Sequence, residues 1–139
     1  MKKLFSILFL VAFTLTVNAQ STSPRFGTTA NKDNTGRALT YGYTSATYAA
    51  TLTPAPDKFV NYYKVTLTGA ATINITVTNA KLGDTWIYIA SGSGGSRITT
   101  FGTNFVSAGT LTAASGKQVT ATFVFDGAKY VELSRFVEP

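Results

Sequence analysis

Residues 71–78 alternate without a break between apolar and polar side chains. The segment reads ATINITVT, with isoleucine or valine at 73, 75 and 77 and with threonine or asparagine at the positions between. A period of two residues places successive side chains on opposite faces of an extended chain. The pattern therefore predicts a half-buried β-strand with Ile73, Ile75 and Val77 directed inward.

Short runs of the same kind, separated by turn residues, continue along most of the chain. We expect strands at residues 46–53, 59–68, 71–78, 85–90, 97–101, 106–111, 118–125 and 130–136. Asp126-Gly127 predicts a hairpin between the last two of these. There is no strict internal repeat, and no window after residue 19 has the 3.6-residue period of a helix. The predicted fold is all-β, a β-sandwich or jelly-roll-like domain of about eight short strands.

The strand expected at residues 85–90 is apolar on both faces. Trp86 and Tyr88 share one face, and Ile87 and Ile89 share the other. Apolar character on both sides indicates either a central strand or an outer face that meets another surface.

The first twenty residues, MKKLFSILFLVAFTLTVNAQ, have the layout of a secretory signal peptide. Two lysines precede an apolar run that is too short for a membrane span, and small residues allow cleavage after Ala19. We therefore expect a secreted or cell-surface protein whose mature chain has no membrane span. The expected organisation is a signal peptide (1–19), an extended or loop-rich arm (20–45) and one β-sandwich domain (46–139).

Charge and the missing residue types limit the chemistry. The chain has a net charge of +6, which falls to +4 when Lys2 and Lys3 leave with residues 1–19. The remaining basic residues are scattered and do not form a nucleic-acid footprint. Cysteine is absent, so no disulfide supports this secreted chain, and its stability must come from a hydrophobic core or from assembly. We therefore expect a homo-oligomer.

Three segments are similar to a β-domain pattern of bacteriophage structural proteins, namely head fibre, decoration and tail-associated proteins. They read LTGAATINITVTNAKLGDTWIYI, GGSRITTFGTNFVSAGTL and FVFDGAKYVELSR, and the match extends over residues 65–135. The resemblance implies a structural or surface-attachment module with no catalytic activity. The signal peptide departs from that pattern, which favours a cellular secreted protein that shares the module.

Catalytic and metal-binding groups are few. Without His or Cys, a Ser-His or Cys-His pair cannot form. Asp84 and Glu132 are the candidate pair for a glycosidase, but a place in a connection for Asp84 and a place on a strand face near Arg135 for Glu132 are favoured. Residues 31–36, NKDNTG, resemble a calcium loop but supply one carboxylate, so a plain turn is favoured. We expect no enzyme activity, no metal and no cofactor.

Aromatic residues supply the candidate binding or interface positions, which are Tyr41, Tyr43, Trp86 and Tyr88. Tyr41 and Tyr43 flank Gly42, so both project from one side of an extended segment. For Trp86 and Tyr88 a place in the core is the favoured alternative. The predicted function is a secreted, non-enzymatic structural or surface-adhesion module that associates with itself. The alternative is a carbohydrate-binding module that uses exposed tyrosines, and the partner is then a surface glycan instead of a protein.

Overall fold

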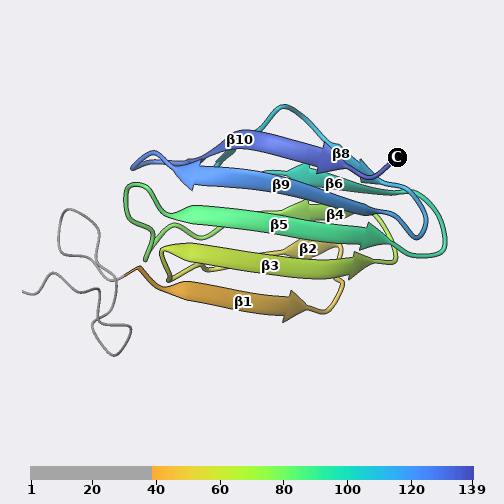
Figure 1. Ribbon diagram of the computed structural model, residues 1–139, viewed down its shortest axis with the longest axis horizontal. Helices are drawn as coiled ribbons and strands as arrows, with labels where there is room; N and C mark the ends of the chain where they lie inside the picture. Colours follow the sequence, from red (N-terminus) through yellow and green to blue (C-terminus); the bar gives the residue numbers. More distant parts are fainter. Residues whose placement is uncertain (1–38) are drawn as a thin grey trace, which may run out of the picture.

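The computed structural model describes residues 39–139, which form ten β-strands in two facing sheets (Figure 1). In spatial order, the six-stranded sheet contains β1 (Tyr41–Ala46), β3 (Val60–Leu67), β5 (Thr85–Gly92), β9 (Gln118–Phe125), β10 (Tyr130–Val137) and β7 (Phe105–Val106). The four-stranded sheet contains β2 (Thr51–Leu52), β4 (Ala71–Ile73), β6 (Arg97–Phe101) and β8 (Leu111–Ala113). Residues 39–139 contain no helix, and so none that could cross a membrane.

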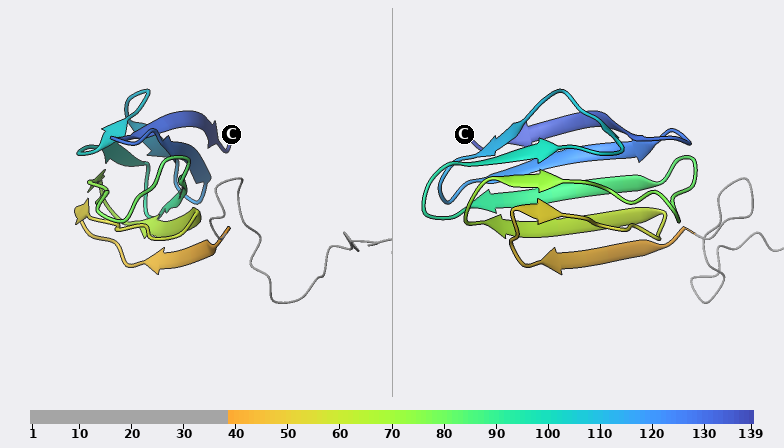
Figure 2. Two further views of the ribbon diagram at one scale, coloured as in Figure 1. Left: turned by 90° about the vertical axis from the view of Figure 1, so that its left-hand side faces the viewer. Right: turned by 180° about the vertical axis from the view of Figure 1, so that it is seen from behind.

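The first six strands alternate between the two sheets. In the larger sheet β1, β3 and β5 are parallel, and in the smaller sheet β2, β4 and β6 are parallel. Each pair of consecutive strands is therefore one coil, which stacks on the coil before it as in a β-solenoid. The left view of Figure 2 shows the two sheets facing each other around a shared interior.

The all-β class is confirmed, but the prediction of a β-sandwich or jelly roll is wrong. Those folds are built from antiparallel strands, whereas β1, β3 and β5 of the larger sheet are parallel to one another here, as are β2, β4 and β6 of the smaller sheet. Alternating side chains establish that a segment is a half-buried strand. They do not establish the direction of its neighbour, because both kinds of ladder have the same side-chain period.

Antiparallel strands complete the stack after β6. β8 is antiparallel to β6, β9 to β5, and β10 to β9. The hairpin predicted at Asp126-Gly127 is confirmed, since it joins β9 to β10 and Gly127 has a φ of 102°. Oδ1 of Asp126 accepts hydrogen bonds from the backbone N–H groups of Ala128 (2.8 Å) and Lys129 (2.7 Å), which fixes the turn.

The core between the sheets is largely aromatic. Ile73 and Ile75 are buried as predicted, and Val77 packs against the core while partly buried. The buried rings lie in contact with one another, with centroids 4.8–6.3 Å apart, and come from Tyr63, Trp86, Tyr88, Phe101, Phe105, Phe123, Phe125 and Tyr130. Rings at these separations add favourable edge and offset contacts to the area that they bury.

The segment boundaries differ from those expected. β1 begins at Tyr41, inside the segment 20–45 that was predicted as an arm, and pairs with β3. The strand expected at residues 46–53 is divided, because Ala46 ends β1 and β2 contains only Thr51–Leu52. The predicted signal peptide, residues 20–38 of the arm and the NKDNTG turn lie outside the described residues.

A short segment lies beside the outer edge of β10. β7 pairs with β10 at Phe105 and Val106, and side chains of β10 then bond the backbone of residues 108–110. Glu132 accepts a hydrogen bond from Ala108 N (2.9 Å), and Arg135 donates one to Thr110 O (3.0 Å). Arg135 also donates to Glu132 (Nε–Oε1 2.5 Å), which confirms that Glu132 lies on a strand near Arg135, and this bond lowers the pKa of the Glu132 carboxyl.

Candidate functional site

Three exposed tyrosines lie on neighbouring strands at one edge of the larger sheet. Tyr41 and Tyr43 on β1 are 70% and 66% exposed, and Tyr62 on β3 is 37% exposed. The parallel register pairs Tyr43 with Tyr62, so both side chains leave the sheet on the face away from the core. Tyr41, Tyr43 and Tyr62 are called the tyrosine cluster below.

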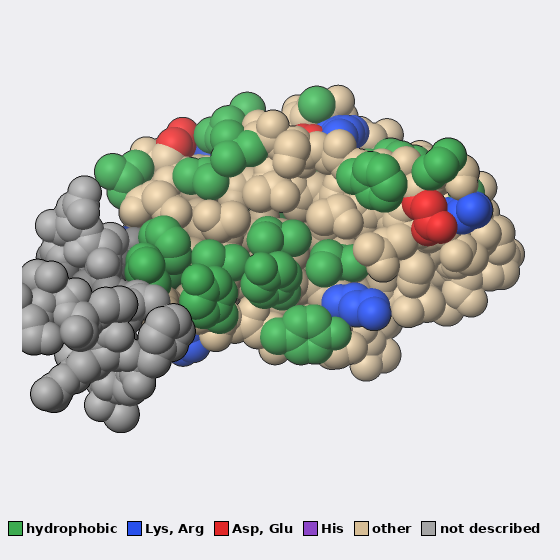
Figure 3. Space-filling model, viewed as in Figure 1, with side chains coloured by type: hydrophobic (Ala, Val, Ile, Leu, Met, Phe, Trp, Pro, Cys, Tyr) green, Lys and Arg blue, Asp and Glu red, His purple; other side chains and the backbone are tan. Residues whose placement is uncertain are grey.

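The tyrosine cluster continues into a wider apolar surface, here called the outer face, which is the side of the six-stranded sheet away from the core. The register places Ile87 beside Tyr62 and Ile89 beside Lys64. Both isoleucines are partly exposed. β5 is therefore a central strand of its sheet, and its second apolar face, formed by Ile87 and Ile89, reaches the surface. Figure 3 shows hydrophobic side chains gathered over β1, β3 and β5 on this face.

Further exposed apolar side chains on β10 are Leu133 and Phe136, and the pairing of Phe136 with Thr120 places Phe136 on the outer face. Val137 is also exposed but pairs with the buried Val119, so it lies on the other side of the sheet. Soluble monomers rarely expose large contiguous apolar areas, and such areas commonly mark contact surfaces. The outer face is therefore the strongest candidate for an interaction surface in the described part of the chain.

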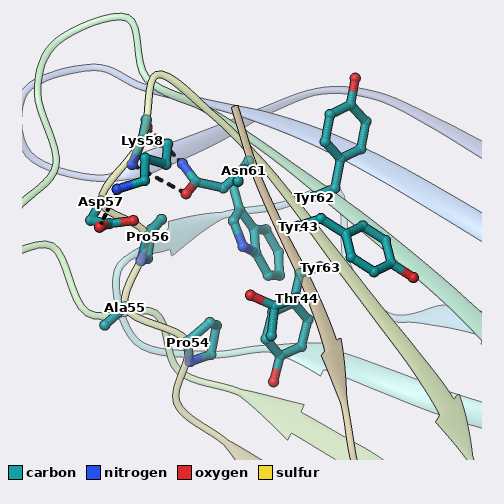
Figure 4. Close-up of a pocket in the computed structure, with 12 residues that line it drawn as sticks. Tyr43, Thr44, Pro54, Ala55, Pro56, Asp57, Lys58, Asn61, Tyr62 and Tyr63 are labelled. Carbon is teal, nitrogen blue, oxygen red and sulfur yellow. Dashed lines mark hydrogen bonds and ion pairs between the residues drawn. The ribbon is translucent and has the colours of Figure 1, made fainter. Parts of the chain in front are cut away.

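A groove of about 300 Å³ lies on the other side of β1 from the tyrosine rings (Figure 4). Its floor contains Tyr63 and Trp86, and one wall is the loop that carries Pro54 and Pro56. Figure 4 shows the rings of Tyr43 and Tyr62 directed away from this loop, although both residues line the groove.

Asn61 holds the loop in place beside the groove. Its side-chain amide donates to Lys58 O (2.7 Å), and its oxygen accepts from Lys58 N (3.2 Å). Lys58 also forms an ion pair with Asp57 (2.8 Å) at the exposed rim. Gly42 faces this arrangement, and a Cβ there would lie 3.0 Å from Lys58 Cγ, so a glycine lets β1 approach the loop.

Hydrogen-bonding groups and aromatic rings therefore meet in the groove. Asn61, Thr44 and Tyr63 supply polar side chains beside the apolar floor. Burial raises the pKa of the Tyr63 phenol above its ordinary value of 10.0. The phenol is neutral at physiological pH and can donate a hydrogen bond.

The four aromatic candidates do not form one site. Tyr41 and Tyr43 are exposed on the outer face, whereas Trp86 is 1% exposed and Tyr88 is fully buried. The core interpretation is thus confirmed for Trp86 and Tyr88, although the Trp86 ring also borders the groove. Tyr62 was not among the candidate residues predicted from the sequence. The alternation of residues 59–68 could have indicated it, because a strand that directs Tyr63 inward directs Tyr62 outward.

Tyr88 makes a buried hydrogen bond with Thr99 (Oη–Oγ1 2.8 Å). Burial raises the pKa of Tyr88 from 10.0 to about 12, so folding favours the neutral phenol.

The contribution of the Tyr88 phenol to the free energy of unfolding is complete below pH 10 and is lost as the pH rises through about 12. The free energy falls by up to about 1.4 kcal/mol for each pH unit in this range. Urea unfolding between pH 8 and pH 12 should show a steeper loss for the natural chain than for Tyr88→Phe. Parallel pH profiles would contradict this prediction.

The candidate glycosidase pair is separated by a strand. Asp84 precedes β5 and Glu132 lies on β10, with β9 between them. Asp84 accepts a hydrogen bond from Lys81 N (2.7 Å), which confirms its predicted place in a connection, and Glu132 is held by Arg135. Within residues 39–139 no group of three or more His, Cys, Asp or Glu is placed to hold a metal ion.

No protein-family model matches the chain, and a search of the curated proteins finds no match. The resemblance to bacteriophage structural proteins therefore stays a prediction. The described residues define a β-solenoid-like protein with an exposed apolar face and a groove at one edge.

Proposed function

We propose that the chain is a secreted, non-enzymatic adhesion module that binds a surface through the tyrosine cluster and associates with itself. The observation that carries this proposal is the exposure of Tyr41, Tyr43 and Tyr62 on adjacent strands of a rigid sheet. Tyrosine offers a large apolar ring with a polar end and dominates many contact surfaces. The apolar start of the sequence supports secretion.

The structure of the outer face suits contact rather than enclosure of a ligand. Its side chains project from paired β-strands, so little conformational entropy is lost when a partner covers them. Ile87 and Ile89 extend the apolar area beyond the tyrosines, and Lys64 adds a positive charge beside Ile89. These features fit a broad surface partner, and the same apolar area supports self-association.

Carbohydrate binding is the second candidate function, because the tyrosine cluster exposes aromatic rings on one face of the sheet. Sugar rings stack on aromatic faces and need hydrogen bonds for their hydroxyl groups. The tyrosine cluster offers the rings, and its phenol hydroxyls offer hydrogen-bonding groups on the same face.

Adsorption of the purified chain to polysaccharide films and to protein films, followed by quartz-crystal microbalance, tests both candidates. We expect Tyr43→Ala and Tyr62→Ala each to weaken binding at least about tenfold, the effect of losing a contact residue worth more than about 1.4 kcal/mol. Ile98→Ala is the matched control, since Ile98 is 46% exposed on the smaller sheet.

The film that retains the chain identifies the partner class. If the tyrosine variants lose binding only to the polysaccharide film, the carbohydrate candidate is supported. If they lose binding only to the protein film, adhesion to protein is supported. Equal retention of the natural chain and both tyrosine variants would contradict a role for the tyrosine cluster.

A further inference from the structure

Within residues 39–139, the outer edge of β1 presents backbone groups that no strand pairs with. β1 is the edge strand of the six-stranded sheet, and Val60 N donates to Thr40 O (3.0 Å) at its start. In a parallel ladder with this register, residues 42, 44 and 46 direct their N–H and C=O groups toward β3. The same groups of Tyr41, Tyr43 and Ser45 therefore point away from the sheet, and no strand within residues 39–139 pairs with them.

Nothing in β1 protects this edge. Proteins commonly guard an edge strand with a charge, a proline or a bulge. β1 reads YGYTSA, which contains neither charge nor proline, and its register with β3 is regular throughout. The ion pair of Lys58 with Asp57 is neutral overall, and Lys64, the register partner of Ser45, lies on β3, so no charged residue stands on the edge strand itself.

At the opposite edge of the larger sheet, β7 pairs with β10 at Phe105 and Val106, and the Glu132 and Arg135 side chains hold residues 108 and 110 beside that strand by hydrogen bonds. A head-to-tail stack would have to displace this segment before β1 of one copy could pair with β10 of the next. Pairing of β1 with β1 displaces nothing within residues 39–139, and such a head-to-head contact closes after two copies.

We infer that β1 pairs in antiparallel fashion with β1 of a second copy, around a two-fold axis at Tyr43. This inference rests on the self-association in the proposed function and names the surface that carries it. Tyr43 would then exchange backbone hydrogen bonds with the partner's Tyr43, and Tyr41 with the partner's Ser45. The two tyrosine clusters would become neighbours on one continuous outer face, which doubles the area offered to a ligand.

Sedimentation velocity and amide hydrogen exchange of the purified chain test this inference together. We expect the apparent mass to double as concentration rises, with the amides of Tyr43 and Ser45 becoming protected in step with the dimer. The amides of Gly42 and Thr44, which face β3, should be protected at all concentrations. They report that β1 is folded in each variant.

Ser45→Pro is the most informative variant, because it removes an N–H group that faces outward and leaves the bonds to β3 intact. We expect it to abolish the dimer, while Ser45→Ala keeps it. Ser45→Lys guards the edge with a charge and should also abolish the dimer, which covers the case that proline disturbs β1.

Three results would overturn the inference, and each has a different meaning. A dimer that survives Ser45→Pro and Ser45→Lys with rapid exchange at Tyr43 and Ser45 would place association on the outer face, in accord with the proposed function. A monomer at every concentration would refute self-association itself. A monomer with protected amides at Tyr43 and Ser45 would show that another part of the same chain covers the edge.

Discussion

Trp86→Ala is expected to lower the free energy of unfolding by about 3–5 kcal/mol, the range measured for large aromatic residues removed from cores. Trp86 is 1% exposed, and its ring lies 5.4–5.8 Å from the rings of Tyr63, Tyr88, Phe105 and Phe123. Alanine would leave a cavity at the point where these rings meet. Urea unfolding followed by circular dichroism measures the loss, since Trp86 is the sole tryptophan and its fluorescence disappears with it.

Tyr41→Ala is the control for this prediction. Tyr41 is 70% exposed, so its removal should change the free energy of unfolding by less than about 0.5 kcal/mol. If the two variants unfolded at the same urea concentration, the aromatic cluster would not be the main stabilising contact of the core.

Gly92→Ala is expected to cost about 1–3 kcal/mol, because the added methyl group has no space. A Cβ at Gly92 would lie 2.7 Å from the carbonyl oxygens of both Ala113 and Ala114. Gly92 ends β5 and accepts a hydrogen bond from Gly116 N (2.8 Å), so the backbone of the turn after β8 lies directly against it. Neither carbonyl can move without disturbing this contact. Thermal unfolding of the variant should show a lower midpoint.

Gly69→Ala provides a matched comparison. A Cβ there would meet the hydroxyl end of Tyr48, which is a side chain that can rotate aside, rather than backbone. We expect a loss below about 1 kcal/mol, the value of the Tyr48 hydrogen bond to Ala70 O. A larger loss for Gly69→Ala than for Gly92→Ala would refute the close backbone approach at β5.

Local strand patterns could be predicted from the sequence, but their pairing could not. Ile73 and Ile75 are buried as their alternation requires, and the Asp126-Gly127 hairpin forms where its turn residues predict. The repetition of the coils is not visible in the sequence because the coils differ in length. Val60, the register partner of Tyr41, lies 19 positions further along the chain, and Thr85, the register partner of Val60, lies 25 positions beyond Val60. Coils of unequal length leave no fixed period in the sequence, so the parallel stack could not be recognised.

The candidate site was predictable only in part for a related reason. Gly42 between two tyrosines correctly placed Tyr41 and Tyr43 on one side of an extended segment. β5 is apolar on both faces, so its alternation could not decide which pair of side chains, Trp86 with Tyr88 or Ile87 with Ile89, is inside. That choice depends on which face of β5 the smaller sheet covers, and this is set by strands distant in the sequence.

The placement of the chain ends has a mechanical consequence. The described chain enters β1 at one end of the strands, and the carboxyl terminus leaves β10 at the other end (Figure 1). Tension applied between these two points runs along the strand axes, so the ladder between β1 and β3 is sheared along its whole length instead of being unzipped one bond at a time. Rupture then requires many hydrogen bonds to break together, which slows forced unfolding. A molecule tethered at one terminus and pulled at the other would therefore resist load.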